Sequence, residues 1–471
     1  MLRVSRPTAS YLVCSLTALA LALAATAQAG TAKSLFRGAQ TPVGFAVDAQ
    51  GGIHAAWIAS DGVHYSTVVN GKKTDTLFLV APGSPDAWVS LALDSAGLPH
   101  VALGPGALSY AHFDGSTWSL ASLGPGGFGV AIAVDADDRP HIAHALEDGT
   151  FEYLHLDDTG WESETPDGIT AALDTPLSLA LDSAGHAHVG LDDAATHHPI
   201  HATNATGEWT TEELADSPCS SASVAVDSLG LPHAALALTG SSTIRYRAFD
   251  GATWSTEDLY DPNALGVANQ PAGAALALDA HDRPEIVFTT RLGGAPTAAA
   301  FHVYRDGVEW RGGPLVGKKA LGPVAIAFDP NGVACAEFAL AAKGGMGLAK
   351  YESIALPDLT GAWTSLDTVV TNGVAHFTGT LQITNAGPGK SRAAKLGFVL
   401  SDDALVDPND LVIFAHASVG ALAPGASRTV KIAVGARAAV AGKHLIAVID
   451  PTGVHDDLDR LNNAIDGPLG D

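Results

Sequence analysis

The chain has 471 residues, and its 50 acidic against 25 basic side chains give a formal net charge of −25 at pH 7. Affinity for nucleic acid and for anionic lipid depends largely on Lys and Arg contacts to phosphate, so this charge argues against both as partners. Hydrophobic residues make up 47% of the chain, which is enough for a large buried core and excludes general disorder.

Residues 1–29 have the layout of a secretory signal peptide. Arg3 and Arg6 precede an apolar Ala/Leu run, and AQA at 27–29 supplies small residues for cleavage. Cys14 would also allow a lipoprotein, but Val13 is bulkier than the residue that such a site needs before its cysteine. No later stretch reaches the roughly eighteen apolar residues of a membrane-spanning helix. We therefore expect an exported protein, secreted or held in the cell envelope, without membrane insertion.

A ten-residue pattern recurs seven times, and its clearest copies are LALDSAGLPH at 91–100 and LALDSAGHAH at 179–188. The copies align on an aspartate, called the anchor here, and successive anchors are 41 to 52 residues apart. This length suits a β-propeller blade of four short strands. We predict an all-β fold, with a seven-bladed β-propeller over residues 30–355. The anchors are Asp48, Asp94, Asp135, Asp182, Asp227, Asp279 and Asp329.

Each unit carries the pattern of four strands. A run of apolar and small residues, such as 91–93, ends at the anchor, and a D-x-x-G or D-x-D-R turn follows. A second strand begins six residues after the anchor, and an aromatic strand such as LSYAHFD at 108–114 follows it. The fourth strand opens with a tryptophan in five units: Trp118, Trp161, Trp209, Trp254 and Trp310.

The last unit, residues 324–353, has three strand-like runs and no tryptophan strand. Residues 33–39, by contrast, precede the first anchor with no strand of their own blade to join. We predict that residues 33–39 supply the fourth strand of the seventh blade. This exchange would close the ring and remove the exposed edges of an open sheet.

A histidine stands six residues after the anchor in five units, and the last two units have Glu285 and Cys335 there. A ring of histidines suggests a metal site or an acid sensor. A structural role is favoured, because residues that recur in every blade usually satisfy a repeated turn or backbone group. The histidines are His54, His100, His141, His188 and His233.

Two cysteines follow the signal segment, Cys219 and Cys335, and they lie far apart in the sequence. They could pair in an oxidising compartment, but a scaffold that depends on disulfides would contain many more cysteines. We expect two separate thiols.

The repeats resemble the D-x-x-G-x-x-H propeller units of secreted bacterial proteins, a superfamily often described as sialidase-like or BNR-like. This resemblance implies the propeller architecture and does not extend to sialidase chemistry. FDGSTW at 113–118 and FDGATW at 249–254 are one residue shorter between Asp and Gly than a sialidase Asp-box. Arginines are few, and no FRIP-like motif is present, so the arginine triad of a sialidase is not expected.

Residues 356–471 alternate apolar and polar residues over strand lengths, with Gly, Pro, Asn and Asp between the runs, which is the pattern of a β-sandwich. This segment closely resembles CARDB, the cell-adhesion-related domain of bacteria, which has an immunoglobulin-like fold. The resemblance implies a structural or adhesive module. Its features are PDL at 357–359, NAGPG at 385–389, LSDD at 400–403, LAPG at 422–425 and the D-P…N-N pattern of 450–463.

Acidic pairs in this segment could coordinate calcium, which takes six to eight oxygen ligands. No EF-hand spacing is present, so solvated turn carboxylates are favoured and no cofactor is expected. The pairs are Asp402-Asp403, Asp407 with Asp410, and Asp456-Asp457.

The densest metal-capable cluster is LDDAATHHPIH at 191–201, between the second and third strands of the fourth unit. A zinc site would need a supporting second shell of partners, so an exposed polar loop is favoured. This loop and the longer segment 257–274 are expected on the face opposite the D-x-x-G turns. The candidate binding residues are Asp192, Asp193, His197, His198 and His201.

The leading functional hypothesis is a non-enzymatic, exported binding or adhesion-type protein. Its propeller would present loops to an extracellular glycan, a peptide or a surface protein or polymer, and its sandwich would act as a spacer or docking module. The alternative is a carbohydrate-active hydrolase or lyase at the mouth of the propeller channel, which would need two carboxylates, or a carboxylate with a histidine or tyrosine. A purely structural envelope component, without a concave site, is a third possibility. No catalytic residue is predicted.

Overall fold

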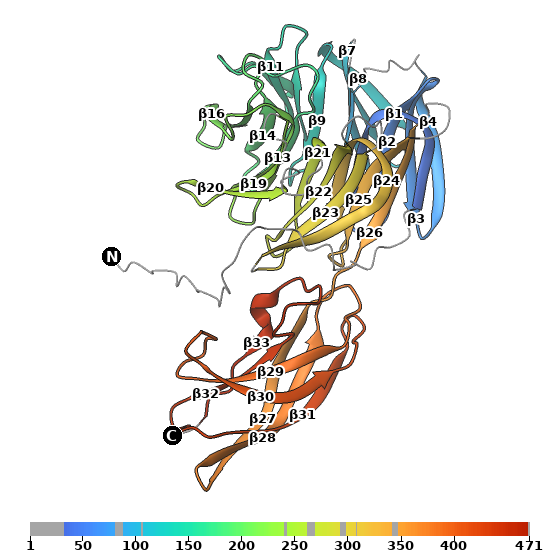
Figure 1. Cartoon of the computed structure of the whole chain (residues 1–471). Helices are drawn as coiled ribbons and strands as arrows, with labels where there is room; N and C mark the ends of the chain where they lie inside the picture. The colour runs from blue at the N-terminus through green and yellow to red at the C-terminus, as the bar shows by residue number, and fades with distance from the viewer. Residues whose placement is uncertain are drawn as a thin grey trace. The chain divides into compact units, whose positions relative to one another are not determined.

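The computed structural model describes residues 33–80, 88–104, 107–239, 243–260, 269–292, 298–307, 309–341 and 347–469 (Figure 1). Regular structure in these ranges is antiparallel β-sheet, apart from a 3₁₀ helix, η2, at Arg460–Asn463. Contacts divide the described chain into two compact units, one with residues 33–304 and 312–354 and the other with residues 305–311 and 355–469. None of the described helical structure is long and apolar enough to cross a membrane.

The first unit is a β-propeller whose described strands form seven four-stranded blades, as the repeats predict. Blade one contains the second part of β1 (Lys33–Val47) with β2 (Ile53–Ala59), β3 (Gly62–Val69) and β4 (Lys72–Val80). Blade two contains β5 (Trp88–Leu93), β6 (Pro99–Gly104), β7 (Ala107–Phe113) and β8 (Trp118–Pro125). Blade three contains β9 (Phe128–Val134), β10 (Pro140–Ala145), β11 (Phe151–Asp157) and β12 (Gly160–Glu164).

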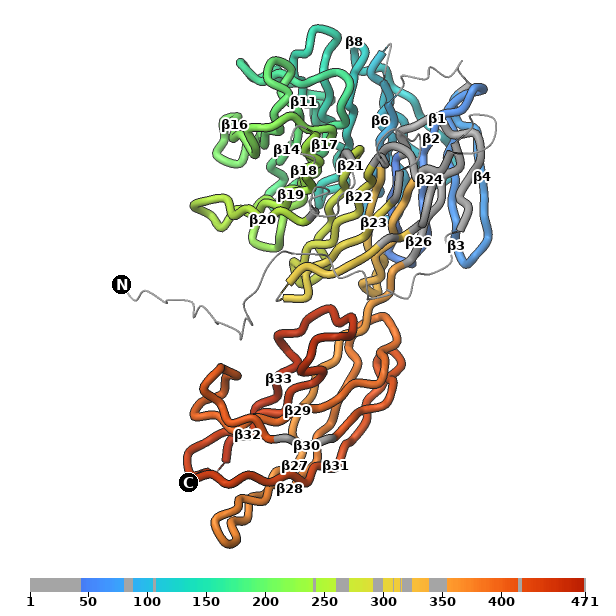
Figure 2. The backbone as a smooth tube through the Cα atoms, in the orientation of Figure 1, coloured from blue at the N-terminus to red at the C-terminus, as the bar shows by residue number. Residues whose placement is uncertain are grey.

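The remaining blades continue this order, and Figure 2 shows their backbones as successive hairpins from teal through green to yellow. Blade four contains β13 (Ser178–Leu181), β14 (Ala187–Asp192), β15 (Pro199–Thr203) and β16 (Thr210–Glu213). Blade five contains β17 (Cys219–Val226), β18 (Pro232–Leu238), β19 (Thr243–Phe249) and β20 (Trp254–Tyr260). Blade six contains β21 (Asn269–Leu278), β22 (Pro284–Leu292), β23 (Ala298–Arg305) and the first part of β24 (Trp310–Phe328). Blade seven contains the second part of β24, β25 (Ala334–Ala341), β26 (Gly347–Ile354) and the first part of β1.

The N-terminal strand closes the ring. Lys33 pairs with Tyr351 and Ala39 with Gly347, so residues 33–39 form the outer strand of blade seven beside β26. From Gln40 onward the same strand pairs with β2 of blade one. Figure 1 shows the blue strands of blade one next to the orange strands of blade seven. The predicted strand exchange is therefore confirmed.

The first strand of each blade lies on the inside of the ring, where contacts run from β1 to β5, β9, β13, β17 and β21 in turn. Small residues allow these strands to approach one another closely. At Gly44, a Cβ atom would lie 2.7 Å from Leu91 Cβ, which is shorter than a van der Waals contact. This crowding explains why the predicted inner strands are rich in small residues.

The anchor aspartates hold the turns between first and second strands. In all seven, Oδ1 accepts hydrogen bonds from the backbone N–H groups two and four residues later, over 2.6 to 3.0 Å. The repeated aspartate is thus a local turn cap, because its side chain satisfies backbone donors that the turn leaves free.

Two of these turns use an aspartate where the others have a left-handed glycine. Asp138 and Asp282 have φ angles of 63° and 61°, whereas the matching Gly97 has 76°. Each carboxylate accepts hydrogen bonds from the backbone N–H and the hydroxyl of a serine in the preceding blade, Ser95 or Ser228. Aspartate tolerates the left-handed region better than most residues, and here it adds a link between blades.

The tryptophans also join neighbouring blades. Trp118 of blade two packs edge-on against Tyr65 of blade one, with ring centroids 5.4 Å apart. The same edge-on contact recurs between Trp161 and Tyr110, whose ring centroids are 5.0 Å apart, and between two further pairs in blades three to five. These further pairs are Trp209 with Tyr153, and Trp254 with His201, where a histidine replaces the tyrosine. The recurring aromatic residues are therefore packing contacts between blades.

The second unit contains two sheets around one core, which fits the predicted immunoglobulin-like sandwich. One sheet has β27 (Leu359–Thr371), β28 (Val374–Asn385) and β31 (Ser427–Ala436). The other has β29 (Ala394–Ser401), β30 (Leu411–Val419), β32 (His444–Ile449) and β33 (Ala464–Ile465). Phe377 from the first sheet and Phe398 from the second belong to the same buried cluster, as the alternating sequence predicts.

Candidate functional site

The repeated histidines are buried within the blades and bonded to side chains of their own repeat. In blade five, His233 Nδ1 lies 2.5 Å from the Tyr246 hydroxyl, and Nε2 lies 3.5 Å from the anchor Asp227. His54 and His141 are held in the same way between their anchors and Tyr65 or Tyr153. In these three blades the contacts give the histidine the structural role that its recurrence favours, because both of its ring nitrogens lie beside a side chain of the same repeat.

Blade four varies this arrangement. Its anchor Asp182 bonds His186 in the turn, at 2.8 Å, and His188 bonds His201 instead of a tyrosine, at 3.0 Å. Burial lowers the pKa of His201 to about 3, and the nearby His188 lowers it further. Burial also lowers the pKa of His188.

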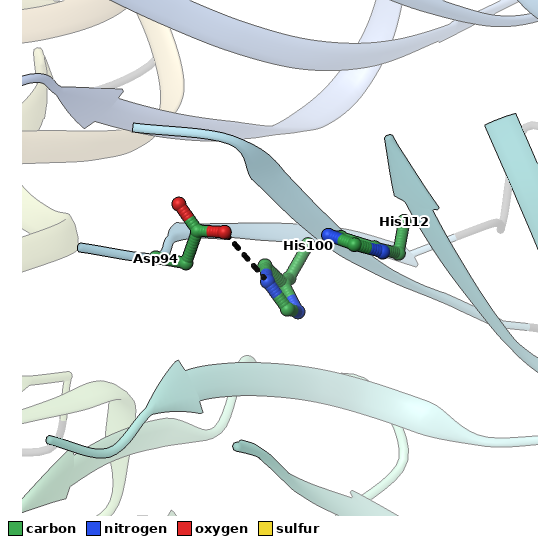
Figure 3. Close-up of side chains that lie close together, drawn as sticks. All are labelled: Asp94, His100 and His112. Atoms are coloured by element: carbon green, nitrogen blue, oxygen red, sulfur yellow. Dashed lines mark ion pairs between the residues drawn. The ribbon is translucent and has the colours of Figure 1, made fainter. Parts of the chain in front are cut away.

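In blade two, a second histidine lies beside the repeated one, in addition to the anchor and the tyrosine (Figure 3). Asp94 lies at the end of β5, His100 on β6 and His112 on β7, and one ligand atom from each lies within 4.8 Å of the others. The distance from His100 Nε2 to Asp94 Oδ2 is 3.7 Å, which is too long for a hydrogen bond. His100 Nε2 is buried and has no hydrogen-bond partner. Among the described residues, these three form the cluster whose ligand atoms lie close enough together to hold a metal ion.

The rings of His100 and His112 face each other, with centroids 4.3 Å apart. Burial lowers the pKa of His100 to about 4, and the positive charge of a protonated His112 would lower it further. His100 is therefore neutral at pH 7, which is the form of imidazole that coordinates metals.

The five candidate binding residues of blade four do not form one cluster. His201 lies inside the blade against Trp254, and His198 lies near Glu213, with 3.3 Å between Nδ1 and Oε2. Asp193 caps the loop, because its Oδ1 accepts from the Thr196 N–H at 2.9 Å and its Oδ2 accepts from the Thr170 hydroxyl. These residues occupy separate environments.

Asp192 and His197 are the two that the structure brings together. His197 Nδ1 lies 3.5 Å from Asp192 Oδ2, and the side-chain exposures are 54% and 2%. Burial raises the pKa of Asp192 to about 6, although the nearby His197 opposes this effect. The other oxygen of Asp192, Oδ1, is buried without a hydrogen-bond partner.

The backbone holds this pair firmly. The His197 carbonyl accepts from the Cys219 N–H at 3.2 Å, and the Asp192 carbonyl accepts from the Ala172 N–H at 2.7 Å. His197 has a φ of 58°, whereas the other described non-glycine residues with positive φ are all Asn or Asp. Such a backbone conformation is uncommon and often marks a functional position. The other predicted loop, 257–274, includes residues 261–268, which lie outside the described ranges.

The acidic pairs of the second unit are engaged in local contacts. Asp402 forms an ion pair with Lys443, and Asp410 Oδ2 accepts from the Asp407 N–H at 2.7 Å. Asp403 accepts from the Leu405 N–H at 2.9 Å. Asp403 and Asp410 therefore cap described turns, whereas Asp402 is held by the ion pair.

Asp457 differs from these solvated carboxylates because it is buried. It accepts from the Leu359 N–H at 3.2 Å and from the Asn463 side chain at 3.3 Å. Burial, with the nearby charge of Asp358, raises the pKa of Asp457 to about 8. The carboxyl group of Asp457 thus supports the packing of the C-terminal segment.

No disulfide joins Cys219 and Cys335, and each is buried in a different hydrophobic cluster, as expected for two separate thiols. Burial raises the pKa of the Cys219 thiol, and the nearby Asp192 carboxylate raises it further. Cys219 is therefore a neutral thiol in the propeller core.

Sequence reasoning did not single out His112. It lies directly opposite His100 across the β6–β7 pair, where blades one and five have Thr67 and Ala248. This position has no consistent residue type in the repeat. Counting the register from the tyrosine two residues earlier would have placed His112 beside His100.

Comparison with known proteins identifies a CARDB domain at residues 356–466. No curated protein sequence matches this chain. Among solved structures, a PL25 ulvan lyase is 10% identical, with a TM-score of 0.46, over 67% of this chain and 95% of that one.

Two other solved structures show similar values. A lectin of Aleuria aurantia in complex with Fucα1-6GlcNAc is 11% identical, with a TM-score of 0.40, over 72% of this chain and 97% of that one. The intramolecular trans-sialidase of Ruminococcus gnavus is 10% identical, with a TM-score of 0.37, over 69% and 95%. Likenesses at this level carry no information about function.

Proposed function

We propose that this protein is an exported glycan-binding protein whose recognition surface lies around Asp192 and His197, on the β14–β15 loop of blade four. The observation that carries this proposal is the buried, unpartnered Oδ1 of Asp192 behind a half-exposed His197. A buried acceptor without a partner costs free energy, about 1–3 kcal/mol, so its retention favours a role in binding.

The chemistry of this pair suits a ligand rich in hydroxyl groups. A carboxylate accepts hydrogen bonds from sugar hydroxyls, and an imidazole can accept or donate another. A hydroxyl that reaches between the two side chains would satisfy Oδ1. The net charge of −25 disfavours anionic ligands, so a neutral glycan is the preferred class.

The second unit fits a supporting role beside the propeller. In its acidic pairs, Asp403 and Asp410 cap turns, Asp402 pairs with Lys443 and Asp457 is buried, and its two sheets enclose one core. We assign this CARDB domain the role of a spacer or docking module, and we place the protein outside the cytoplasm because of the signal-like segment at residues 1–29.

The proposal is tested by binding the purified chain to a panel of neutral and acidic polysaccharides. Two variants carry the test. Asp192→Asn removes the charge, and His197→Asn removes the imidazole with a residue that tolerates positive φ. Each is expected to weaken binding to a neutral glycan about tenfold or more, the effect of losing a hydrogen bond to a charged group.

The matched control is His186→Asn. His186 also pairs with an aspartate of blade four, but it precedes β14, whereas Asp192 ends that strand. The control should bind as the unchanged chain does. The proposed surface would be overturned if Asp192→Asn and His197→Asn bound the glycan as tightly as the unchanged chain and the His186→Asn control. Release of sugar fragments from a bound glycan would show a hydrolase or lyase instead.

A further inference from the structure

A second cluster of side chains lies at the other end of the blade strands, beside the anchor turn of blade two. We propose that Asp94, His100 and His112 bind one divalent transition-metal ion, and that zinc suits this donor set best. Two imidazole nitrogens and one carboxylate oxygen are common zinc ligands, and three protein ligands leave a fourth position for water or another ligand.

The first support is the position of the ligand atoms. They come from three successive segments of one blade, β5, β6 and β7, and all lie within 4.8 Å of one another. Figure 3 shows His100 between Asp94 and His112. A modest rotation of side chains would bring the three atoms to the distances that a tetrahedral ion requires.

The second support is the unpartnered nitrogen of His100. The residue is 4% exposed, and its Nε2 atom has no hydrogen-bond partner while it faces Asp94 Oδ2 at 3.7 Å. In the other three complete Asp–His–Tyr repeats this distance is 2.9 to 3.5 Å. Blade two therefore leaves a buried, unpartnered nitrogen, and in the tautomer with the proton on Nδ1 this nitrogen is free to bind a cation.

The surrounding contacts orient the ligands as they are oriented in metal sites. Tyr110 holds His100 Nδ1 through a hydrogen bond of 2.6 Å, which directs Nε2 toward Asp94. The Ala96 and Leu98 N–H groups both donate to Asp94 Oδ1, so Oδ2 stays available. Outer partners of this kind fix the tautomer and the ring direction of a ligating histidine.

Other blades lack one element of this site. Blade five has Ala248 in the place of His112, and blade one has Thr67. Blade three has His155 there, but its ring lies 5.8 Å from that of His141, against 4.3 Å in blade two. Blade three therefore provides a natural comparison for the test.

The test measures zinc in the untagged full chain after dialysis, and affinity by competition with a chelator. Cobalt(II) in place of zinc gives an absorption spectrum that reports the coordination geometry. We expect one zinc per chain and a tetrahedral cobalt spectrum. His112→Ala, which introduces the residue that blade five carries naturally, should weaken zinc binding about 100-fold or more, since even outer partners of a metal site cost 10–100-fold.

His155→Ala in blade three is the matched control, because it makes the same change in the same blade position and should leave zinc affinity unchanged. His197→Asn should also leave it unchanged, which separates this site from the proposed glycan surface. Absence of stoichiometric zinc in the unchanged chain would overturn the proposal. Zinc affinity that His112→Ala does not alter would overturn it as well.

Discussion

His201 Nε2 lies 3.0 Å from His188 Nδ1, in the place where four other blades have a tyrosine hydroxyl beside the repeated histidine. Blade four therefore has two buried imidazoles in contact. Burial lowers the pKa of both, that of His201 to about 3. The folded propeller cannot accept protons at these rings without loss of stability.

Low pH should destabilise the folded propeller through His201. The unfolded chain takes up a proton at each histidine near pH 6.5, whereas the folded chain binds one at His201 only near pH 3. Stability contributed by the neutral ring of His201 is fully present above about pH 6.5 and is lost progressively as pH falls toward 3, by roughly 1 kcal/mol per pH unit. His201→Tyr should flatten the decline between pH 6.5 and 4, as measured by urea unfolding. An unchanged slope in this variant would contradict the assignment.

The second prediction concerns Asp192. Its pKa of about 6 means that folding costs free energy whenever this carboxyl is ionised, so the penalty is absent at pH 4 and complete above about pH 6. Asp192→Asn should therefore stabilise the chain at pH 7 by about 2 kcal/mol and have little effect at pH 4. Thermal unfolding at the two pH values measures this difference. Destabilisation at pH 7 would show that the ionised carboxylate has a structural partner.

The third prediction concerns the left-handed Asp282. Asp282→Ala removes the bonds to Ser228 and leaves an L-residue in an unfavourable conformation, whereas Asp282→Gly removes the bonds alone. The alanine variant should be less stable than the glycine variant by about 1 kcal/mol. Denaturant midpoints compare the two. Equal stability would mean that this backbone conformation relaxes in the variant.

The fourth prediction concerns closure of the ring. A chain that begins at residue 40 lacks the outer strand of blade seven and leaves β26 with an unpaired edge. It should lose several kcal/mol of stability, on the scale of the apolar surface that one strand buries, and should associate at high concentration. A chain that begins at residue 33 is the control. Light scattering and thermal unfolding compare them, and identical behaviour would argue against the exchange.

The repeat made the architecture predictable because the same residue types make the same contacts in most blades. The anchor aspartate, the histidine six residues later and the tryptophan of the fourth strand are all used locally or between neighbouring blades. The closing strand was predictable by counting strands. Residues 324–353 contain three strand-like runs where a blade needs four, and residues 33–39 form a run with no blade of their own. Sequence distance is no obstacle to such an inference when the number of strands per blade is known.

The sites were less predictable, because they depend on side-chain direction and on strand register. Five polar residues within 191–201 suggested one cluster, but β15 begins at Pro199, and His201 lies inside the blade. Asp192 and His197 meet only because a left-handed turn brings His197 back over the strand end. His112 is twelve residues from His100 and meets it only through the β6–β7 register.

The pairing of residues 33–39 with residues 347–351 has a consequence for the order in which the propeller can fold. The partner strand β26 is the last strand of the propeller to be made, so the ring cannot be completed until the whole propeller has been synthesised. Residues 33–39 must wait as an unpaired segment, and the late pairing of these distant segments is an intrinsically slow step. For the exported protein that we propose, a long delay before closure would suit passage across a membrane in the unfolded state, because a ring that closed too early would block that passage.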